Sequence, residues 1–473
     1  MDIPSTILLI IEILLAIIVV GIVFVILIEN RNPQKTISWI LVLICLPVVG
    51  IIFYLFFGQE HWRKRKLMKR MHRRLYEKNI PSLNSNYVTY PPEYDRLISM
   101  FTNINDSPVL TGTKIDFYTD GKDQFKQLFE DIGNAMYHIH ILYYKIIDDE
   151  IGNELKRLLI SKVRQGVEVR LIYDDVGSIR TGKKYFHEMK KEGIEVISFL
   201  EVKLPKLARR VNYRNHRKIV IIDGKIGYTG GMNVADCYIN GFSWGKWKDM
   251  QIRMEGNGVK GLQKVFLTDW YFSGKPALHS NSYFPEMPDD GNNPLQIVSS
   301  GPTDGYNSIE KGILQAINLA KKSIYIQTPY FIPSEIILSA LQTAAISNIS
   351  VHVMLPCKSD SYFVDRATHS YVRDLVEYGI NVYLYEGGFL HTKCMVVDDE
   401  LVSVGSANMD IRSFELSFET NAFIYDYETA KKAKDIFMDD ARDSRQVISS
   451  VWRKRPVRRR FMEAVMRIFT PLF

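Results

Sequence analysis

Two long apolar stretches open the chain. Thr6 to Ile28 is interrupted by a single charged residue, Glu12, and Ile37 to Phe57 is a second apolar run of similar length. About 20 apolar residues in a helix are enough to cross the hydrocarbon core of a membrane. Because only a short polar stretch, residues 29–36, separates the two runs, the pattern predicts a transmembrane helical hairpin.

Basic residues on the two sides of this hairpin predict its orientation. A basic run begins at His61 and continues to Arg74, whereas the short connection carries only Arg31 and Lys35. Since cytoplasmic flanks carry the excess of Lys and Arg, both ends of the hairpin are expected in the cytoplasm, where the basic run would also attract anionic headgroups. The first apolar run is too long for a signal peptide, and it lacks a basic n-region and a cleavage site.

From about Tyr87 onward, short apolar strands alternate with amphipathic helices, which predicts α/β layers. A linker rich in Pro, Asn, Asp and Gly, Lys275 to Pro294, divides this region into two comparable halves. Each half shows the order strand, helix, strand, so one fold unit is predicted to occur twice. The segments are 139–141, 152–164 and 167–172 in the first half, and 324–326, 334–345 and 349–355 in the second.

These patterns divide the chain into four parts. Residues 1–74 form the hairpin with its basic flank, 75–290 and 291–450 form the two α/β domains, and 451–473 form a basic tail. The tail predicts an amphipathic helix, which can lie at the membrane interface or pack on its own domain. Its apolar positions at helical spacing are Val457, Phe461, Ala464, Val465 and Ile468.

The net charge of +7 is concentrated at the two ends of the chain. Residues 1–74 and residues 451–473 each carry a net +6, which leaves residues 75–450 at −5. An enzyme that acts on nucleic acid needs a basic working surface, so the acidic middle argues against a nuclease. The cysteines are widely spaced and lack a CxxC pair, which indicates neither a zinc site nor a disulfide framework and fits a reducing compartment. They are Cys45, Cys237, Cys357 and Cys394.

One motif occurs once in each half. The segments from His216 to Asp223 and from His391 to Asp398 both read H-x-K-x4-D, and the register continues with a Gly 14 residues and an Asn 17 residues after each His. A single His-x-Lys is usually an ordinary surface pair, but two copies in the same register are not expected by chance. The added positions are Gly230, Asn233, Gly405 and Asn408.

The apolar run after each lysine predicts a strand. Residues two apart on a strand point to the same face, so His216 and Lys218 should project together, and the second copy should do the same. Asp223 and Asp398 lie an odd number of residues from the histidine and next to turn residues. We therefore expect these two aspartates to order the end of the strand rather than to touch a substrate.

A histidine beside a fixed cation, present twice, suits attack on a phosphodiester. One neutral imidazole can attack phosphorus, while the opposite imidazolium protonates the leaving alkoxide and then deprotonates the acceptor alcohol. Lysine would supply the positive charge that the transition state needs, so neither a metal nor another cofactor is expected. The motif leaves open which of His216 and His391 is the nucleophile, and His216 is the preferred candidate. The other candidate residues are Lys218 and Lys393 as cations, Asn233 and Asn408 as hydrogen-bond donors to phosphate, and Asp249 and Glu419 as carboxylates that orient the imidazoles.

Two further features surround the motifs. The carboxylates Asp249 and Glu419 follow their histidines at unequal offsets, 33 and 28 residues. The glycines at positions 230, 231 and 405 are expected to let the backbone approach the phosphate closely.

These residues resemble the phospholipase D superfamily, whose members pair two HKD motifs across a pseudo-twofold interface. The resemblance covers about residues 105–445. The segments 30–33, 328–333 and 405–414 resemble those of bacterial cardiolipin synthases. It implies an α/β fold in which two phospholipase D-like repeats, each a mixed sheet flanked by helices, form one catalytic unit behind the two-helix transmembrane hairpin. The resemblance also implies that Asp223 and Asp398 belong to the catalytic residues.

The resemblance implies synthesis of cardiolipin in a bacterial cell membrane by a multi-pass protein with a cytoplasmic catalytic domain. A phosphatidyl group would pass from one phosphatidylglycerol to a second through a phosphohistidine, with release of glycerol. The expected partners are phosphatidylglycerol and other anionic membrane lipids, not nucleic acid, and an oligomer is left open. The alternatives are a phospholipase D-type hydrolase that gives phosphatidic acid, a phosphatidyltransferase that uses serine, a membrane-tethered nuclease and a lipid-binding scaffold; intact His and Lys pairs count against the scaffold.

Overall fold

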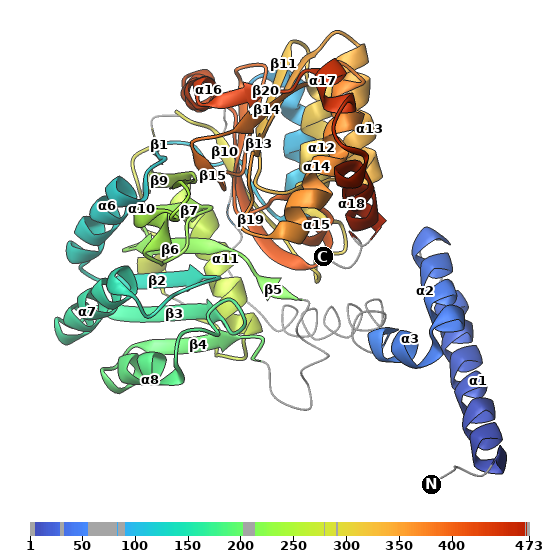
Figure 1. Cartoon of the computed structure of the whole chain (residues 1–473). Coiled ribbons are helices and arrows are strands. Elements are labelled where there is room, and N and C mark those ends of the chain that lie inside the picture. Colours follow the sequence, from blue (N-terminus) through green and yellow to red (C-terminus); the bar gives the residue numbers. More distant parts are fainter. Residues whose placement is uncertain are drawn as a thin grey trace.

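A computed structural model describes residues 5–28, 33–54, 83, 90–201, 213–278, 280–289, 292–468 and 470. Figure 1 shows an N-terminal group of helices beside two α/β halves. The predicted basic run from His61 to Arg74 and the connection at residues 29–32 lie outside the described residues. The orientation of the hairpin therefore stays a prediction.

The N-terminal group contains α1 (Ser5–Ile28), α2 (Pro33–Cys45) and α3 (Pro47–Phe53). Among the described residues, one helix is long and apolar enough to cross a membrane, over Leu9–Ile28. The second apolar run is not the single helix that was predicted, because the helix is interrupted at Leu46, where φ is −136°. Pro47 causes the interruption, since proline disfavours helical geometry at the residue before it.

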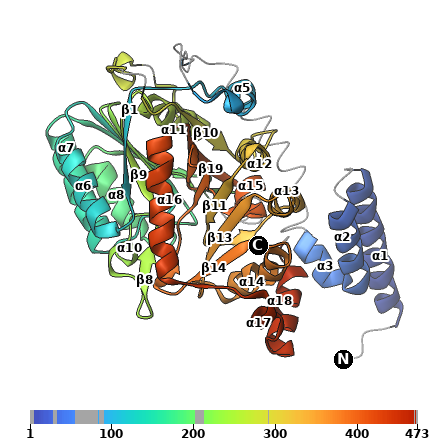
Figure 2. The ribbon, with the colours of Figure 1, turned by 90° about the horizontal axis from the view of Figure 1, so that it is seen from above.

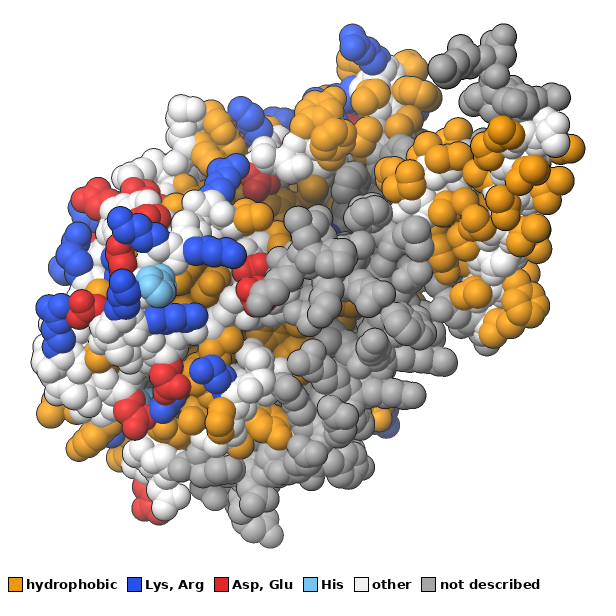
Figure 3. Space-filling model, turned by 90° about the horizontal axis from the view of Figure 1, so that it is seen from below, with side chains coloured by type: hydrophobic (Ala, Val, Ile, Leu, Met, Phe, Trp, Pro, Cys, Tyr) orange, Lys and Arg blue, Asp and Glu red, His pale blue; other side chains and the backbone are white. Residues whose placement is uncertain are grey.

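The three N-terminal helices contact one another through a small apolar core. Ile26, Leu43 and Tyr54 are buried there, and Trp39 meets Tyr54 edge to face with ring centroids 5.6 Å apart. Most other apolar side chains of α1, α2 and α3 are exposed, as Figure 3 shows for one face of the group. A helix that is apolar on all sides and is not covered by protein is typical of a segment that lies in lipid.

The first half builds a seven-stranded sheet in the order β1-β9-β7-β6-β2-β3-β4. The pairs β2–β3 and β3–β4 are parallel and the other pairs are antiparallel. Its strands are β1 (Thr113–Tyr118), β2 (His138–Tyr143), β3 (Glu168–Asp174), β4 (Glu195–Phe199), β6 (Lys218–Ile222), β7 (Ile226–Gly230) and β9 (Gln251–Gly256). Its helices are α6 (Gly121–Gly133), α7 (Glu150–Arg164), α8 (Lys183–Lys191) and α11 (Val259–Phe272).

The second half repeats this topology strand for strand. Its path begins β10-β19-β17-β16-β11-β13-β14, with the same parallel and antiparallel pairs, and β20 is added at the edge. Its strands are β10 (Leu295–Ser300), β11 (Ser323–Gln327), β13 (Ser350–Pro356), β14 (Asn381–Tyr385), β16 (Cys394–Val397), β17 (Leu401–Gly405), β19 (Ser417–Ile424) and β20 (Ser444–Gln446). Its helices include α12 (Ser308–Leu319), α13 (Glu335–Ile346), α14 (Tyr362–Val376) and α16 (Tyr427–Arg442). The predicted duplication of one mixed α/β unit is therefore confirmed.

Five layers result, and Figure 2 shows them from above. Helices α6, α7 and α8 cover the outer face of the first sheet, and α12, α13 and α14 cover the outer face of the second. Between the sheets, α11 and α16 share one apolar core with the inner faces of both. This shared core holds the two halves in one fixed arrangement, which the active site requires.

Helix α5 (Asp95–Asn105) does not follow the sequence-based division at residue 290. Its residues Leu97, Ile98 and Phe101 are buried in the core of the second half, and Phe101 packs on Phe423 of β19 with ring centroids 4.6 Å apart. The second half therefore includes a helix that precedes the first half in the chain.

The tail forms α17 (Ser449–Arg453) and α18 (Val457–Ile468), which confirms its helical spacing. Met466 is buried, and Arg467 donates to Asp374 of α14 at 2.6 Å. Val457 and Phe461 remain exposed on the opposite side. Helix α18 thus packs on its own domain and keeps an apolar outer face.

Candidate active site

Two short strands of the first half pair with strands of the second half. β5 (Arg214–Asn215) pairs in parallel with β19, and β8 (Lys246–Lys248) pairs in parallel with β15 (Gly388–Leu390). The backbone N–H of His216 donates to the carbonyl of Phe418 at 2.9 Å, and that of His391 donates to the carbonyl of Lys248 at 2.6 Å. Both motif histidines therefore lie at the junction of the two halves.

The carboxylate that orients each histidine comes from the opposite half. Glu419 Oε1 lies 3.1 Å from His216 Nδ1, and Asp249 Oδ2 lies 2.6 Å from His391 Nδ1. Both carboxylates are fully buried, and the Ser406 hydroxyl donates to Glu419. Because each Nδ1 is engaged, Nε2 of each ring is left for a ligand, and no described residue bonds to it. The sequence predicted carboxylates for this position but not their exchange between halves.

The two motif lysines are buried beneath the histidines. Lys218 Nζ donates to the His216 carbonyl at 2.6 Å, and Lys393 Nζ donates to the His391 carbonyl. Burial lowers the pKa of Lys218 to about 7 and that of Lys393 to about 8. Each lysine also interacts electrostatically with both Asp249 and Glu419. The charged groups of the two motifs therefore form one coupled cluster.

The same burial acts on the histidines. It lowers the pKa of His391 to about 4, with a further contribution from Lys393, and it also lowers the pKa of His216. Burial alone would raise the pKa of Asp249, but Lys393 and His391 outweigh it and hold this pKa below the ordinary value. The free enzyme therefore presents neutral imidazoles that are backed by carboxylates.

A cavity of about 410 Å³ opens between the halves above this cluster. Both histidines line it, together with Asn233, Asn408 and Glu419. Lys218, Lys393 and Asp249 are not among the residues that line it. The described residues include no group of three or more His, Cys, Asp and Glu that could hold a metal ion, and the four cysteines are free.

The two motif asparagines differ in their contacts. Asn233 accepts from the Lys145 backbone N–H at 3.1 Å and donates to the Tyr238 hydroxyl at 2.7 Å. Asn408 Oδ1 is buried without a hydrogen-bond partner among the described residues. Asn408 is therefore better placed than Asn233 to contact a ligand in the cavity.

The motif aspartates lie away from the cavity, at the far end of their strands. Asp223 accepts from the backbone N–H groups of Met136, Tyr137 and His138 at 2.7–2.9 Å. Asp398 accepts from the three equivalent N–H groups before β11 at 2.6–2.8 Å. The position of both aspartates agrees with the odd spacing from the histidine. Both aspartates anchor the start of a strand, β2 and β11, which supports the expectation that they order the strand end.

Replacing Asp223 with alanine is expected to lower the free energy of unfolding by about 2–4 kcal/mol, because three backbone N–H groups lose a charged acceptor. Unfolding of the full chain in detergent by urea, followed by tryptophan fluorescence, measures this change. Asp435→Ala is the matched control, since Asp435 is exposed on α16, and it should change stability by less than about 0.5 kcal/mol. Equal stability of the two variants would contradict the anchoring role.

The glycines near the motifs face protein rather than the cavity. A Cβ at Gly231 would lie 1.9 Å from Asp249 Oδ1, and one at Gly405 would lie 2.2 Å from the Thr420 carbonyl. Gly230 has φ +154° and would meet the Met250 carbonyl at 2.4 Å. The expected close approach to phosphate is therefore wrong for these positions, which instead need glycine to let the strands and the carboxylate pack.

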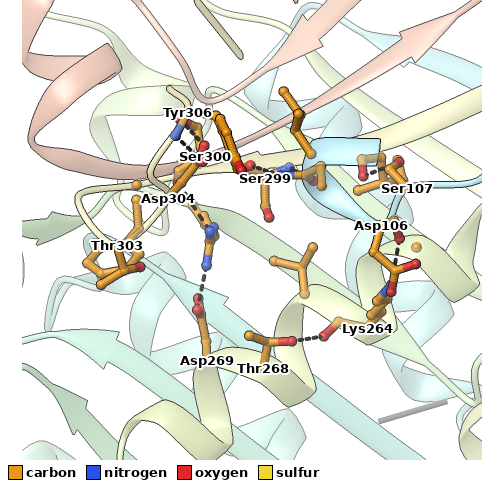
Figure 4. A pocket seen from close by; sticks show the side chains of 18 of the residues that line it. Asp106, Ser107, Lys264, Thr268, Asp269, Ser299, Ser300, Thr303, Asp304 and Tyr306 are labelled. Atoms are coloured by element: carbon orange, nitrogen blue, oxygen red, sulfur yellow. Dashed lines mark hydrogen bonds and ion pairs between the residues drawn. The ribbon is translucent and has the colours of Figure 1, made fainter. Parts of the chain in front are cut away.

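The residue between His216 and Lys218 points to the other side of the sheet. Arg217 lines a second cavity, of about 470 Å³, and pairs there with Asp269 of α11. Figure 4 shows this cavity with Asp269 on its wall. Its guanidinium also donates to the carbonyls of Glu419 at 3.0 Å and Ser300 at 3.2 Å. Arg217 therefore fastens β19, which carries Glu419, to the first half.

Several cavity residues were not identified from the sequence. They are Tyr144, Lys145, Arg214, Tyr238, Trp247, Tyr330, Asp360 and Arg412. Residues two apart on a strand point to the same face, and Arg214 lies two residues before His216. The sequence could therefore have predicted that Arg214 faces the same cavity as His216. The aromatic residues come from distant segments and carry no comparable signal.

Two linked α/β repeats that exchange carboxylates around paired His-x-Lys motifs define a phospholipase D-type unit. Residues 128–242 and 313–441 match the family described as "Cardiolipin synthase, PLD-like domain". Residues 13–59 match the family described as "Phospholipase_D-nuclease N-terminal". The chain belongs to the cardiolipin synthase family of the phospholipase D superfamily.

Individual proteins support this assignment. The chain is 39% identical to a cardiolipin synthase of Geobacillus kaustophilus, over 96% of this chain and 92% of the relative. It is 41% identical to the major cardiolipin synthase of Bacillus subtilis, over 94% and 95% of the two chains. A phosphatidylserine synthase of Haemophilus influenzae shares the fold, with a TM-score of 0.59 and 13% identity over 80% of this chain and 98% of the other.

Proposed function

We propose that this protein synthesises cardiolipin by transferring a phosphatidyl group from one phosphatidylglycerol to a second, through a phosphohistidine intermediate. The observation that carries the proposal is the exchange of carboxylates, which places two oriented imidazoles at one cavity. Family membership supplies the substrate class, since the relatives are cardiolipin synthases. The net charge of −5 over residues 75–450 favours lipid over nucleic acid.

In the first step, a neutral imidazole attacks the phosphorus of the donor lipid in line with the glycerol oxygen. A nitrogen–phosphorus bond forms, the phosphorus–oxygen bond to glycerol breaks, and the opposite imidazolium gives its proton to the leaving alkoxide. The bound phosphodiester anion favours the ammonium forms of Lys218 and Lys393, whose pKa values burial has lowered to about 7 and about 8. These ammonium groups then offset the charge that develops on the phosphoryl oxygens.

In the second step, the same two rings work in reverse. The opposite imidazole, now neutral, takes the proton of a hydroxyl on the second phosphatidylglycerol as that oxygen attacks phosphorus. The nitrogen–phosphorus bond breaks and cardiolipin leaves. One phosphodiester replaces another in the overall exchange, so the reaction needs no nucleotide.

We assign the nucleophile to His216. Its side chain is 17% exposed, against 8% for His391, so phosphorus reaches it more readily. Glu419 at Nδ1 directs the lone pair of Nε2 into the cavity. His391 is then the acid and base, and the bound phosphodiester must raise its pKa from about 4 before it carries the proton.

The N-terminal helices are proposed to hold this site at the membrane, where both lipid substrates are concentrated. The span Leu9–Ile28 supports a membrane anchor. A second pass through α2 and α3, with the catalytic halves in the cytoplasm, is part of the proposal and rests on the basic residues that follow the hairpin in the sequence.

Incubating the purified chain with phosphatidylglycerol that carries labelled glycerol and labelled phosphate tests the proposal. Cardiolipin and free glycerol are expected in equal amounts, because each transfer releases one glycerol. Phosphatidic acid without cardiolipin would contradict the proposal and identify a hydrolase.

A further inference from the structure

The cavity is asymmetric around its two histidines. Beside His391 it is largely aromatic: Trp247 and Tyr330 have ring centroids 5.1 and 6.2 Å from the imidazole. On the His216 side, two arginines that belong to neither motif line the wall, Arg214 and Arg412. The roles of the two rings as nucleophile and as acid and base do not by themselves require this difference.

Arg214 has donors that no described residue uses. It is 3% exposed, and its Nη1 lies 3.3 Å from Asp174 Oδ1, but its Nε and Nη2 are buried without a hydrogen-bond partner. Asp174 does not depend on this contact, because it also accepts from the backbone N–H groups of Val176, Gly177 and Asn215. A buried guanidinium with two unpaired donors is costly unless a ligand completes it.

Arg412 approaches the same place from the second half. It lies in the first turn of α15 (Ile411–Glu415) and is half-buried. Its guanidinium interacts electrostatically with Asp410, which also lines the cavity. Both arginines interact electrostatically with Tyr144, whose ring centroid lies 4.9 Å from that of His216. Both guanidinium groups therefore lie within electrostatic range of Tyr144, which packs beside His216, and both line the same cavity.

We propose that Arg214 and Arg412 form a second phosphate subsite, which binds the phosphodiester of the acceptor lipid while its terminal hydroxyl attacks the phosphohistidine. This inference rests on the proposed function, since phosphatidylglycerol as acceptor carries its own phosphate at the other end of the attacking glycerol. Two guanidinium forks match a phosphodiester anion. Neither water nor free glycerol gains from such a subsite, so it favours lipid transfer over hydrolysis.

The test compares two acceptors with one donor. Phosphatidylglycerol is supplied in mixed micelles with labelled glycerol, so that cardiolipin formation and exchange of labelled glycerol into phosphatidylglycerol are measured together. Arg412→Gln should lower the ratio of cardiolipin formation to glycerol exchange about tenfold or more, because only cardiolipin formation uses an acceptor with a phosphate. Arg214→Lys, which keeps the charge and loses the fork, should lower the ratio as well.

Arg366→Gln is the matched control, since Arg366 is also half-buried but lies outside the cavity, and it should leave the ratio unchanged. An unchanged ratio in Arg412→Gln would overturn the subsite. A second result would also overturn it: millimolar inorganic phosphate inhibits the wild type but not Arg412→Gln, while the ratio is the same in both. The arginines would then bind free phosphate rather than lipid. Wild-type enzyme that exchanges glycerol but makes no cardiolipin would instead contradict the proposed function.

Discussion

Replacing His216 or His391 with asparagine is expected to lower the rate of cardiolipin formation by about 10⁴-fold or more, because each ring takes part in both bond-making steps. The two variants should differ in a second measurement. With a donor lipid whose leaving group needs no proton, His391→Asn should still accumulate labelled phosphohistidine, since His216 can attack but the acceptor is not deprotonated. His216→Asn should accumulate none.

His187→Asn serves as the control, because His187 is exposed on α8 and should tolerate the change. If both active-site variants kept more than a tenth of the wild-type rate, the two-histidine mechanism would be wrong. If His216→Asn accumulated the labelled phosphohistidine and His391→Asn did not, the roles of the two rings would be exchanged and the overall chemistry would be unchanged.

The second large effect is expected at the exchanged carboxylates. Asp249→Asn and Glu419→Gln should each lower the rate by about 10²–10⁴-fold, since an amide no longer holds the imidazole in the reactive tautomer. Each carboxylate raises the pKa of the histidine that it contacts. Glu419→Gln should therefore lower the pKa of His216, and Asp249→Asn should lower that of His391.

Titration of labelled histidine by NMR, with the full chain in detergent, measures these shifts. Glu428→Gln, an exposed change in the first turn of α16, should affect neither the rate nor the titration. A shift of His391 in Glu419→Gln with His216 unmoved would mean that each carboxylate acts within its own half, against the observed contacts.

Much of the fold follows from local patterns in the sequence. The segments 139–141 and 324–326 lie within β2 and β11, and the segments 167–172 and 349–355 each begin one residue before β3 and β13. A short apolar run between turn residues is a strong signal for a buried strand. The registered motifs placed both histidines correctly because their spacing is itself a product of the repeated topology. The odd offset of Asp223 and Asp398 was enough to direct them away from the cavity.

What the sequence did not predict depends on contacts between distant segments. His216 and Glu419 are 203 residues apart, and His391 and Asp249 are 142 apart, so no local period connects them. Helix α5 joins the second core for the same reason. The interruption before Pro47 is different: proline was visible within the apolar run, and its restriction of Leu46 would have predicted two shorter helices.

Glu419 and Asp249 each orient the histidine of the opposite half, so neither repeat can assemble a working centre by itself. Two identical copies of one repeat would give both rings the same surroundings. Two different repeats in one polypeptide are free of that constraint. One side could gain arginines while the other gained aromatic rings, so a symmetric scaffold could come to distinguish the lipid that gives from the lipid that receives.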